Sequence, residues 1–135
     1  MKYCDILKSV KTIAVLGISD KEERDSGRIA KFLVSKGYQV VGVHPILKEV
    51  FGIPVYKTLL DIEHNIDLVD IFIGSDRIPQ LVPDIIKLQP KYVWLQLGIY
   101  HQEAIESLEK AGITVIYDAC IAIEYNLCRF GNVGV

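Results

Sequence analysis

The sequence predicts an α/β protein in which a doubly wound, mostly parallel sheet of about five to six strands is covered by helices on both faces. Apolar runs of strand length alternate along the chain with segments whose apolar residues recur at helical spacing. These runs are almost continuously apolar, which is typical of strands buried on both faces. Several of them stop at glycine, a strong local signal for a turn.

Composition and charge limit the classes of function. The chain has 135 residues, which fits one domain over 1–135. Hydrophobic residues make up 50% of the chain, a fraction that excludes a disordered protein. The net charge of -2 provides no general basic surface, so we expect no nucleic-acid partner.

Other features predict a soluble cytoplasmic protein. Charged residues interrupt the first positions before an apolar signal segment could form, and no apolar run approaches the roughly 20 residues of a membrane span. The cysteines Cys4, Cys120 and Cys128 lack metal-ligand spacing, and their simplest interpretation is reduced thiols in the cytoplasm. The histidines also lack a metal-binding pattern, so we expect no metal.

The first quarter of the chain predicts a helix, a strand and a second helix. Residues 2–10 have apolar side chains at helical spacing, and this short helix is expected to cover an edge of the sheet. Residues 11–18 form a nearly continuous apolar run, the pattern of a central parallel strand. Residues 26–36 carry apolar residues on one helical face, with Ser26 or Asp25 as the expected N-cap.

The next stretch predicts a second strand over 39–44, which Pro45 ends. A strand, a helix and a strand in this order predict a right-handed βαβ unit. We expect a loop or a single turn over 46–52 and a short edge strand at 55–56. A one-turn helix over 58–62, capped by its threonine, follows.

The rest of the chain continues the alternation of strands and helices. The expected elements are a strand over 66–73, a helix over 77–88, a strand over 91–97, a helix over 102–110, a strand over 113–117 and a short helix over 121–127. Pro79 is tolerated because it falls in the first turn of its helix.

Four of the predicted strand ends are expected to meet at one edge of the sheet. Ligands of doubly wound sheets bind beyond the carboxyl ends of the strands. The residues that follow those ends are Gly17, His44, Gly74 and Gly98. We therefore expect these residues to line a ligand site.

The loop after the first strand has the small residues of a phosphate-binding turn but departs from the dinucleotide pattern. Gly17-Ile-Ser19 replaces the opening GxG, and a charged stretch precedes the helix. Ser19 and Ser26 could offer small side chains and close amides, and Arg24 and Arg28 could bind phosphate oxygens. The alternative for either arginine is a solvated helix-end charge balanced by neighbouring acids.

The second strand lacks the carboxylate that NAD sites use to bind ribose hydroxyls. His44 could contact adenine, ribose or phosphate, or be only a polar strand end. Gly74 and Ser75 could let a ligand approach the backbone, or simply form a tight turn. Arg77 could meet a further phosphate.

Residues with catalytic potential are few. Cys120 follows the last predicted strand and could be a reactive thiol, but an inert buried cysteine is favoured because no histidine neighbours it in sequence. Glu124 could be a general base, although a capping or salt-bridge role is favoured. No nucleophile-elbow motif is present.

The motifs, taken together and in order, resemble one known family. They are Ile13-Ala-Val-Leu-Gly-Ile-Ser, Gly37-Tyr38, Val43-His-Pro45, Val69-Asp-Ile-Phe72, Val93-Trp-Leu-Gln-Leu-Gly98, and Asp118-Ala-Cys-Ile121 with Glu124. From residue 11 to residue 127 the chain resembles the small stand-alone CoA-binding proteins, also called the YccU-like family. That family is similar to the amino-terminal CoA-binding domain of the succinyl-CoA synthetase alpha subunit.

The resemblance implies a Rossmann-like domain that binds coenzyme A (CoA) or an acyl-CoA. By position it implies phosphate contacts from Gly17, Ser19, Arg24, Ser26 and Arg28. It also implies that Val43 and Pro45 flank the nucleotide and that Gly74 and Ser75 lie beside the adenine or the pantetheine arm. The far wall of the site would be formed by Gln96 and Gly98. The chain departs from the family pattern at His44, where we expect asparagine, and at Gly27-Arg28, where bulkier residues are common.

The leading hypothesis is therefore a CoA-binding or acyl-CoA-binding module without chemistry of its own. The catalytic phosphohistidine of the synthetase belongs to a second domain, so the resemblance implies no catalysis by that route. The alternative is an NAD(P)-linked oxidoreductase or an acyl transferase that uses Cys120. A protein partner or a homo-oligomer stays open in either case.

Overall fold

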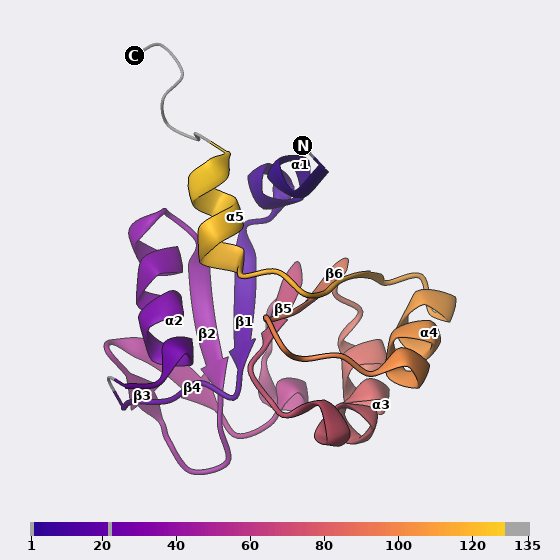
Figure 1. Ribbon diagram of the computed structural model, residues 1–135. Helices are drawn as coiled ribbons and strands as arrows, with labels where there is room; N and C mark the ends of the chain where they lie inside the picture. Colours follow the sequence, from indigo (N-terminus) through magenta and orange to yellow (C-terminus); the bar gives the residue numbers. More distant parts are fainter. Residues whose placement is uncertain (1, 22, 129–135) are drawn as a thin grey trace.

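The computed structural model describes residues 2–21 and 23–128, and across these residues one sheet of 7 strands forms the centre of the molecule (Figure 1). The strands are β1 (Thr12–Leu16), β2 (Gln39–Val43), β3 (Glu49–Val50), β4 (Ile53–Tyr56), β5 (Leu68–Ile71), β6 (Tyr92–Leu95) and β7 (Thr114–Ile116). Their order is β3-β4-β2-β1-β5-β6-β7, and each neighbouring pair is parallel except β3 and β4. The predicted Rossmann-like sheet is confirmed, with slightly more strands than expected.

The additional strand is β3, which lies in the stretch where we expected a loop or a single turn. Val50 of β3 pairs with Ile53 of β4 in an antiparallel hairpin. Its two turn residues, Phe51 and Gly52, have positive φ angles of 52° and 81°. Tight hairpins require such angles, but phenylalanine is not a usual turn residue and gave no sequence signal. Because β3 forms the edge, β4 is an inner strand, contrary to the prediction.

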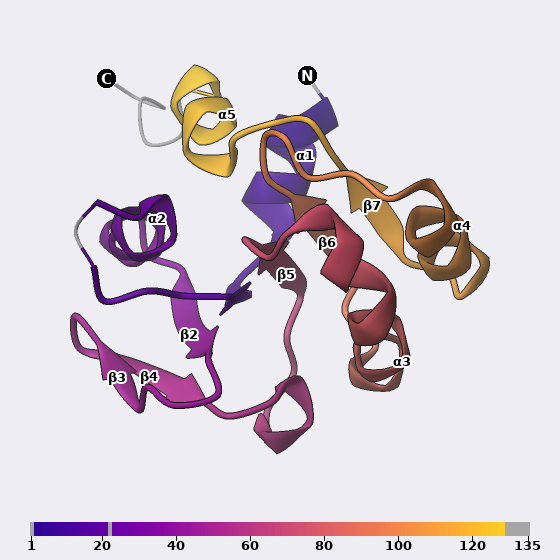
Figure 2. The same ribbon diagram turned by 60° about the horizontal axis from the view of Figure 1, so that its bottom comes forward.

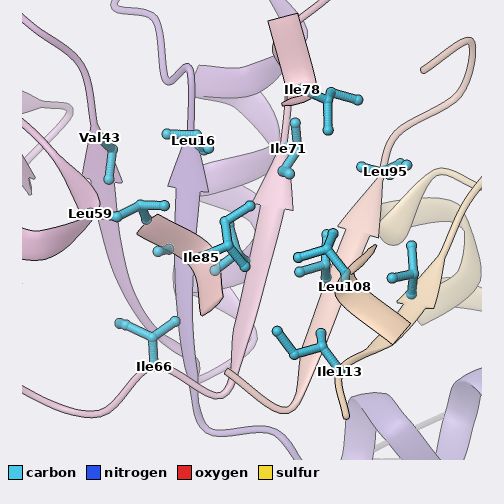
Figure 3. Packing of buried hydrophobic residues seen from close by; sticks show 14 of the residues in the cluster. Leu16, Val43, Leu59, Ile66, Ile71, Ile78, Ile85, Leu95, Leu108 and Ile113 are labelled. Carbon is cyan, nitrogen blue, oxygen red and sulfur yellow. The ribbon is translucent and has the colours of Figure 1, made fainter. Parts of the chain in front are cut away.

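Helices cover both faces of the sheet, as Figure 2 shows. On one face lie α1 (Lys2–Ser9), α2 (Asp25–Ser35) and α5 (Ile121–Leu127), and on the other lie α3 (Ile78–Leu88) and α4 (Gln102–Lys110). Each face has its own hydrophobic cluster. In the cluster under α3 and α4, the side chains of Ile78, Ile85 and Leu108 point toward the strands (Figure 3).

The first helix covers a face of the sheet instead of the expected edge. Leu7 of α1 is 1% exposed and belongs to the same hydrophobic cluster as Leu33 of α2. The Tyr38 hydroxyl donates a hydrogen bond to the Leu7 carbonyl oxygen, and burial raises the pKa of Tyr38 above its usual range. Burial of Leu7 and this hydrogen bond hold α1 against the segment between α2 and β2, and α1 also packs beside α5. Within the part of the chain that is described, no helix is long and apolar enough to cross a membrane.

The helix ends follow the predictions in some places and correct them in others. The 3-10 helix Leu59–Asp61 (η1) is capped by Thr58 in a capping box, as expected. A second 3-10 helix, Ser75–Arg77 (η2), leads into α3. For α2 the prediction of Ser26 or Asp25 as N-cap is wrong. Both residues are already helical, and the N-cap is Arg24, whose side chain forms no capping hydrogen bond.

The cysteines also correct the sequence interpretation. Cys4 of α1 and Cys128, the residue after α5, form a disulfide with an S–S distance of 2.08 Å, whereas all three cysteines were expected to be reduced. Cys120 is the free cysteine. The bonded pair is 124 positions apart in the sequence, so nothing local indicated the bond. Packing of α1 beside α5 brings the two thiols together (Figure 1).

Candidate ligand-binding site

Two neighbouring clefts lie beyond the carboxyl ends of β1, β2 and β5. The first cleft, of about 690 Å³, is formed by the β1–α2 loop, the start of α2 and the segment after β2. The second cleft, of about 600 Å³, extends from the end of β2 across η1 to the start of α3. Both volumes are in the range of small-molecule sites. Residues Gly17, Arg24, His44 and Phe72 line both clefts, so the two adjoin.

Gly17 ends β1 at the junction of the clefts, and its position requires glycine. Its φ angle is +90°, and its amide donates a hydrogen bond of 3.0 Å to the Val43 carbonyl oxygen. A Cβ atom here would lie 3.0 Å from Cγ1 of Ile73. The backbone of β1 can therefore turn toward α2 without a side chain entering the junction.

The start of α2 forms one wall of the first cleft. Ser26 is 4% exposed, and Ser19 in the preceding loop accepts a hydrogen bond of 3.1 Å from the Lys21 amide. The loop contacts the helix so closely that a Cβ on Gly27 would lie 2.4 Å from the Ser19 carbonyl oxygen. The N-cap Arg24 forms no side-chain capping hydrogen bond, so among the described residues no N-cap side chain competes with an anion for the first amides of α2.

His44 has a defined orientation between the two clefts. Its Nδ1 accepts hydrogen bonds of 3.0 Å from the amides of both Ile46 and Leu47. In the neutral ring the proton therefore lies on Nε2, which is left as a donor. The side-chain oxygen of an asparagine can accept hydrogen bonds from amides two residues along the chain. His44 thus supplies an acceptor at the position where the family resemblance implied asparagine.

The charges of the two clefts differ. The first cleft is lined by the acids Asp20, Glu23 and Asp25 against Lys21 and Arg24. The second cleft is lined by Arg24, Lys57 and Arg77 against a single acid, Asp84. The sequence had indicated Arg77, but Lys57 and Phe72 were missed. Lys57 directly follows β4, whose end was not among the four strand ends expected to line the site.

The two clefts bring together most of the residues expected to bind a ligand. Those lining one or both clefts are Gly17, Ser19, Arg24, Ser26, Val43, His44, Pro45 and Gly74. The expected residues Arg28, Ser75, Gln96 and Gly98 are not among the residues lining these clefts. Their predicted ligand contacts stay predictions.

Three of these outlying residues have contacts within the protein. The Arg28 guanidinium forms a salt bridge with Asp25. The Ser75 hydroxyl accepts a 3.0 Å hydrogen bond from the Tyr100 amide, and Oε1 of the buried Gln96 accepts one of 3.2 Å from the Ile121 amide. The Ser75 contact ties η2 to the loop before α4, and the Gln96 contact ties β6 to the start of α5.

The residues considered for catalysis lie elsewhere. Cys120 is the N-cap of α5, is partly buried and lines neither cleft. Glu124 lies in the first turn of α5 and also lines neither cleft. Among the described residues, no three histidine, cysteine, aspartate or glutamate side chains gather where they could hold a metal ion.

Comparisons with known proteins agree on one family. Residues 11–126 match the model of a family described as CoA binding domain. The chain is 32% identical over 125 residues to the uncharacterized protein YneT of Bacillus subtilis, with 93% of each chain covered. It is 25% identical over 123 residues to an ADP-forming acetate–CoA ligase of Archaeoglobus fulgidus, and this match covers 84% of the chain but only 18% of the ligase.

Solved structures with the same fold are also similar in sequence. A hypothetical protein from Pyrococcus horikoshii has a TM-score of 0.91 and 34% identity, with 94% of this chain and 89% of that chain covered. A protein from Thermus thermophilus has a TM-score of 0.90 and 33% identity, with 94% and 96% covered. In both cases the similarity extends over nearly the whole of both chains.

Proposed function

This chain belongs to the CoA-binding domain family, and from that membership we propose that it binds CoA or an acyl-CoA in the two clefts. We propose that it acts as one binding domain over residues 1–135, without catalysis of its own. A cytoplasmic setting, and a protein partner or a second copy of the chain, are further parts of this proposal.

The observation that carries the proposal is the junction of the two clefts. Gly17, Arg24 and His44 line both clefts beside the uncapped start of α2. An anion at this junction would meet free helix amides and the partial positive charge of the helix end. A diphosphate bound there could direct the nucleotide of CoA into one cleft and its pantetheine arm into the other.

The side chains at the junction are suited to phosphate oxygens. Arg24 offers a guanidinium whose fork of donors can bind two oxygens at once. His44 offers an Nε2 donor on a ring that two backbone amides hold in place. Gly17 has no side chain, so phosphate can come close to its backbone.

The absence of catalysis is proposed because the potential nucleophile lies apart from the ligand site. Cys120 is the N-cap of α5 and lines neither cleft. The acetate–CoA ligase of Archaeoglobus fulgidus is a much longer protein, and its activity is not transferred to this chain. A ligand-binding module is therefore the simpler function.

Isothermal titration of the purified chain with CoA, acetyl-CoA and NAD tests the proposal. We expect CoA or acetyl-CoA to bind with a Kd that is roughly micromolar or lower, and NAD to bind much more weakly. Arg24→Ala should weaken CoA binding by about tenfold, because one charge-assisted contact to phosphate is lost.

The matched control is Lys48→Ala, which removes an exposed cation that lines neither cleft. This variant should bind CoA as the wild type does. If the wild type gives no binding signal with CoA and none with acetyl-CoA, the proposed function is wrong.

A further inference from the structure

The second cleft carries positive charge that the diphosphate at the junction does not use. We infer, on the premise of the proposed function, that this cleft selects the 3′-phosphate on the ribose of CoA and that Lys57 and Arg77 bind it. CoA differs from dephospho-CoA by this one phosphate group. The two residues would therefore determine which of these ligands the chain prefers.

Lys57 and Arg77 carry positive charge that a ligand of the second cleft could reach. Both side chains are exposed and line the second cleft. Among the residues that the structure describes, neither side chain forms a hydrogen bond or a salt bridge. Binding a phosphate would therefore break no ion pair among the described residues, and the new charge-assisted contacts would favour the phosphorylated ligand.

The backbone holds both cations at the same cleft. Lys57 follows Tyr56, whose carbonyl oxygen accepts a 3.0 Å hydrogen bond from the His44 amide at the junction. The Arg77 amide donates a 2.9 Å hydrogen bond to the carbonyl oxygen of Gly74, which also lines the cleft. The two cations thus come from different parts of the chain, Lys57 from the residue after β4 and Arg77 from η2, and both line one cleft.

The remaining lining of the second cleft suits a nucleoside. Leu16, Val43 and Leu59 are buried side chains that form an apolar wall where a flat base can pack. Lys57 and Arg77 are exposed cations of the same cleft, so a base on this wall would have them available to its 3′-phosphate.

The charges of the two clefts favour one direction of the ligand. Among the described residues, the first cleft is lined by the acids Asp20, Glu23 and Asp25 against two cations, so the additional 3′-phosphate is less favoured there than in the second cleft. The uncharged pantetheine arm meets no such penalty there. The phosphorylated nucleoside therefore belongs in the second cleft and the pantetheine arm in the first.

Titration of CoA against dephospho-CoA tests this inference. The wild type should bind CoA at least about tenfold more tightly than dephospho-CoA. In the double variant Lys57→Ala/Arg77→Ala, CoA affinity should fall to that of dephospho-CoA, and dephospho-CoA affinity should not change. The control Lys48→Ala, an exposed lysine outside both clefts, should keep the wild-type preference.

The outcomes separate this inference from the proposed function. If CoA and dephospho-CoA bind the wild type equally, or if the double variant keeps the preference for CoA, the 3′-phosphate inference is wrong and CoA binding stands. If neither ligand binds, the proposed function fails. Circular dichroism and thermal unfolding of each variant check that it is folded, which we expect because both side chains are exposed.

Discussion

Asp70 is a buried acid at the centre of the sheet. Its exposure is 0%, it lies in β5 opposite Val15 of β1 and Trp94 of β6, and its carboxylate oxygens have no hydrogen-bond partner among the described residues. Burial raises the pKa of the Asp70 carboxyl well above its usual value. The charged form is thus disfavoured in the folded protein, and the carboxyl retains its proton to a higher pH than it does in the unfolded chain.

This shift predicts how stability changes with pH. The unfolded carboxyl titrates near pH 4, so above that pH unfolding releases the proton that folded Asp70 retains. The contribution of Asp70 to the free energy of unfolding is therefore fully present below about pH 4 and falls as pH rises toward the raised native pKa. Asp70→Asn should remove this fall, so the stability of the variant relative to wild type should increase with pH.

Urea unfolding of both proteins at several pH values from acid to neutral measures this difference. Asp5→Asn, which changes an exposed acid of α1, is the control and should track the wild type. A stability difference between Asp70→Asn and wild type that stays constant across pH would contradict the assignment.

At the scale of the element, the contact between the β1–α2 loop and the first turn of α2 shapes the first cleft. Gly27 makes that contact possible, because a Cβ there would lie 2.4 Å from the Ser19 carbonyl oxygen and 2.8 Å from the Phe51 ring. The hairpin of β3 and β4 thus also supports the helix start. The family resemblance implied bulkier residues at Gly27-Arg28, and the close contact with the loop supplies a reason for the glycine.

Gly27→Ala should push α2 away from the loop. Alanine favours helix by about 1 kcal/mol over glycine, but overpacking costs typically 1–3 kcal/mol, so we expect a net loss of stability of roughly 1 kcal/mol. CoA binding should weaken as well, because Ser19 and the helix amides would no longer keep their spacing. Thermal unfolding and titration calorimetry measure the two effects.

Gly37→Ala is the matched control for this variant. Gly37 follows the carboxyl end of α2, has a φ of +96°, and a Cβ there would meet no atom within 4 Å. The substitution should lower stability through backbone strain but leave CoA affinity unchanged. Unchanged CoA affinity in Gly27→Ala would show that the loop contact does not shape the ligand site.

At the scale of the whole molecule, the disulfide joins the first and last described helices. Cys4 and Cys128 are 124 positions apart, so the bond closes nearly the whole chain into a loop. Such a bond stabilises a fold mainly by limiting the conformations of the unfolded chain. The contact of Tyr3 with Trp94, whose ring centroids are 5.6 Å apart, holds α1 on the sheet independently of the bond.

Reduction of the disulfide should therefore destabilise the protein without unfolding it. For a loop of this length we expect a loss of roughly 2–5 kcal/mol in the free energy of unfolding, measured by urea titration with and without reductant. Cys4→Ser should show the same loss, whereas Cys120→Ser, at the free cysteine, should keep the oxidised stability. A thiol assay of the denatured, unreduced protein that detects three thiols instead of one would contradict the bond.

The sequence by itself determined the α/β class, the alternation of strands and helices, and much of the ligand edge. Periodic apolar runs are local patterns, and they predicted that strands end at Gly17, His44 and Gly74. Parallel strands place their carboxyl ends at one edge of the sheet, so these three residues were expected to lie together, and all three line the second cleft. The capping box at Thr58 was predictable for the same reason, since it involves residues three positions apart. The family resemblance, confirmed by the comparisons, added the CoA hypothesis to this local information.

Only the tertiary structure decided which distant groups meet. Lys57 and Arg77 line one cleft although they follow strands that are not neighbours in the sheet, and Cys4 reaches Cys128 because α1 packs against α5. The β3–β4 hairpin, formed through a turn with no sequence signal, makes β4 an inner strand, and the parallel pairing of β4 with β2 places Lys57 at the ligand edge. These contacts depend on the packing of the whole chain, and no local pattern of residue types encodes them.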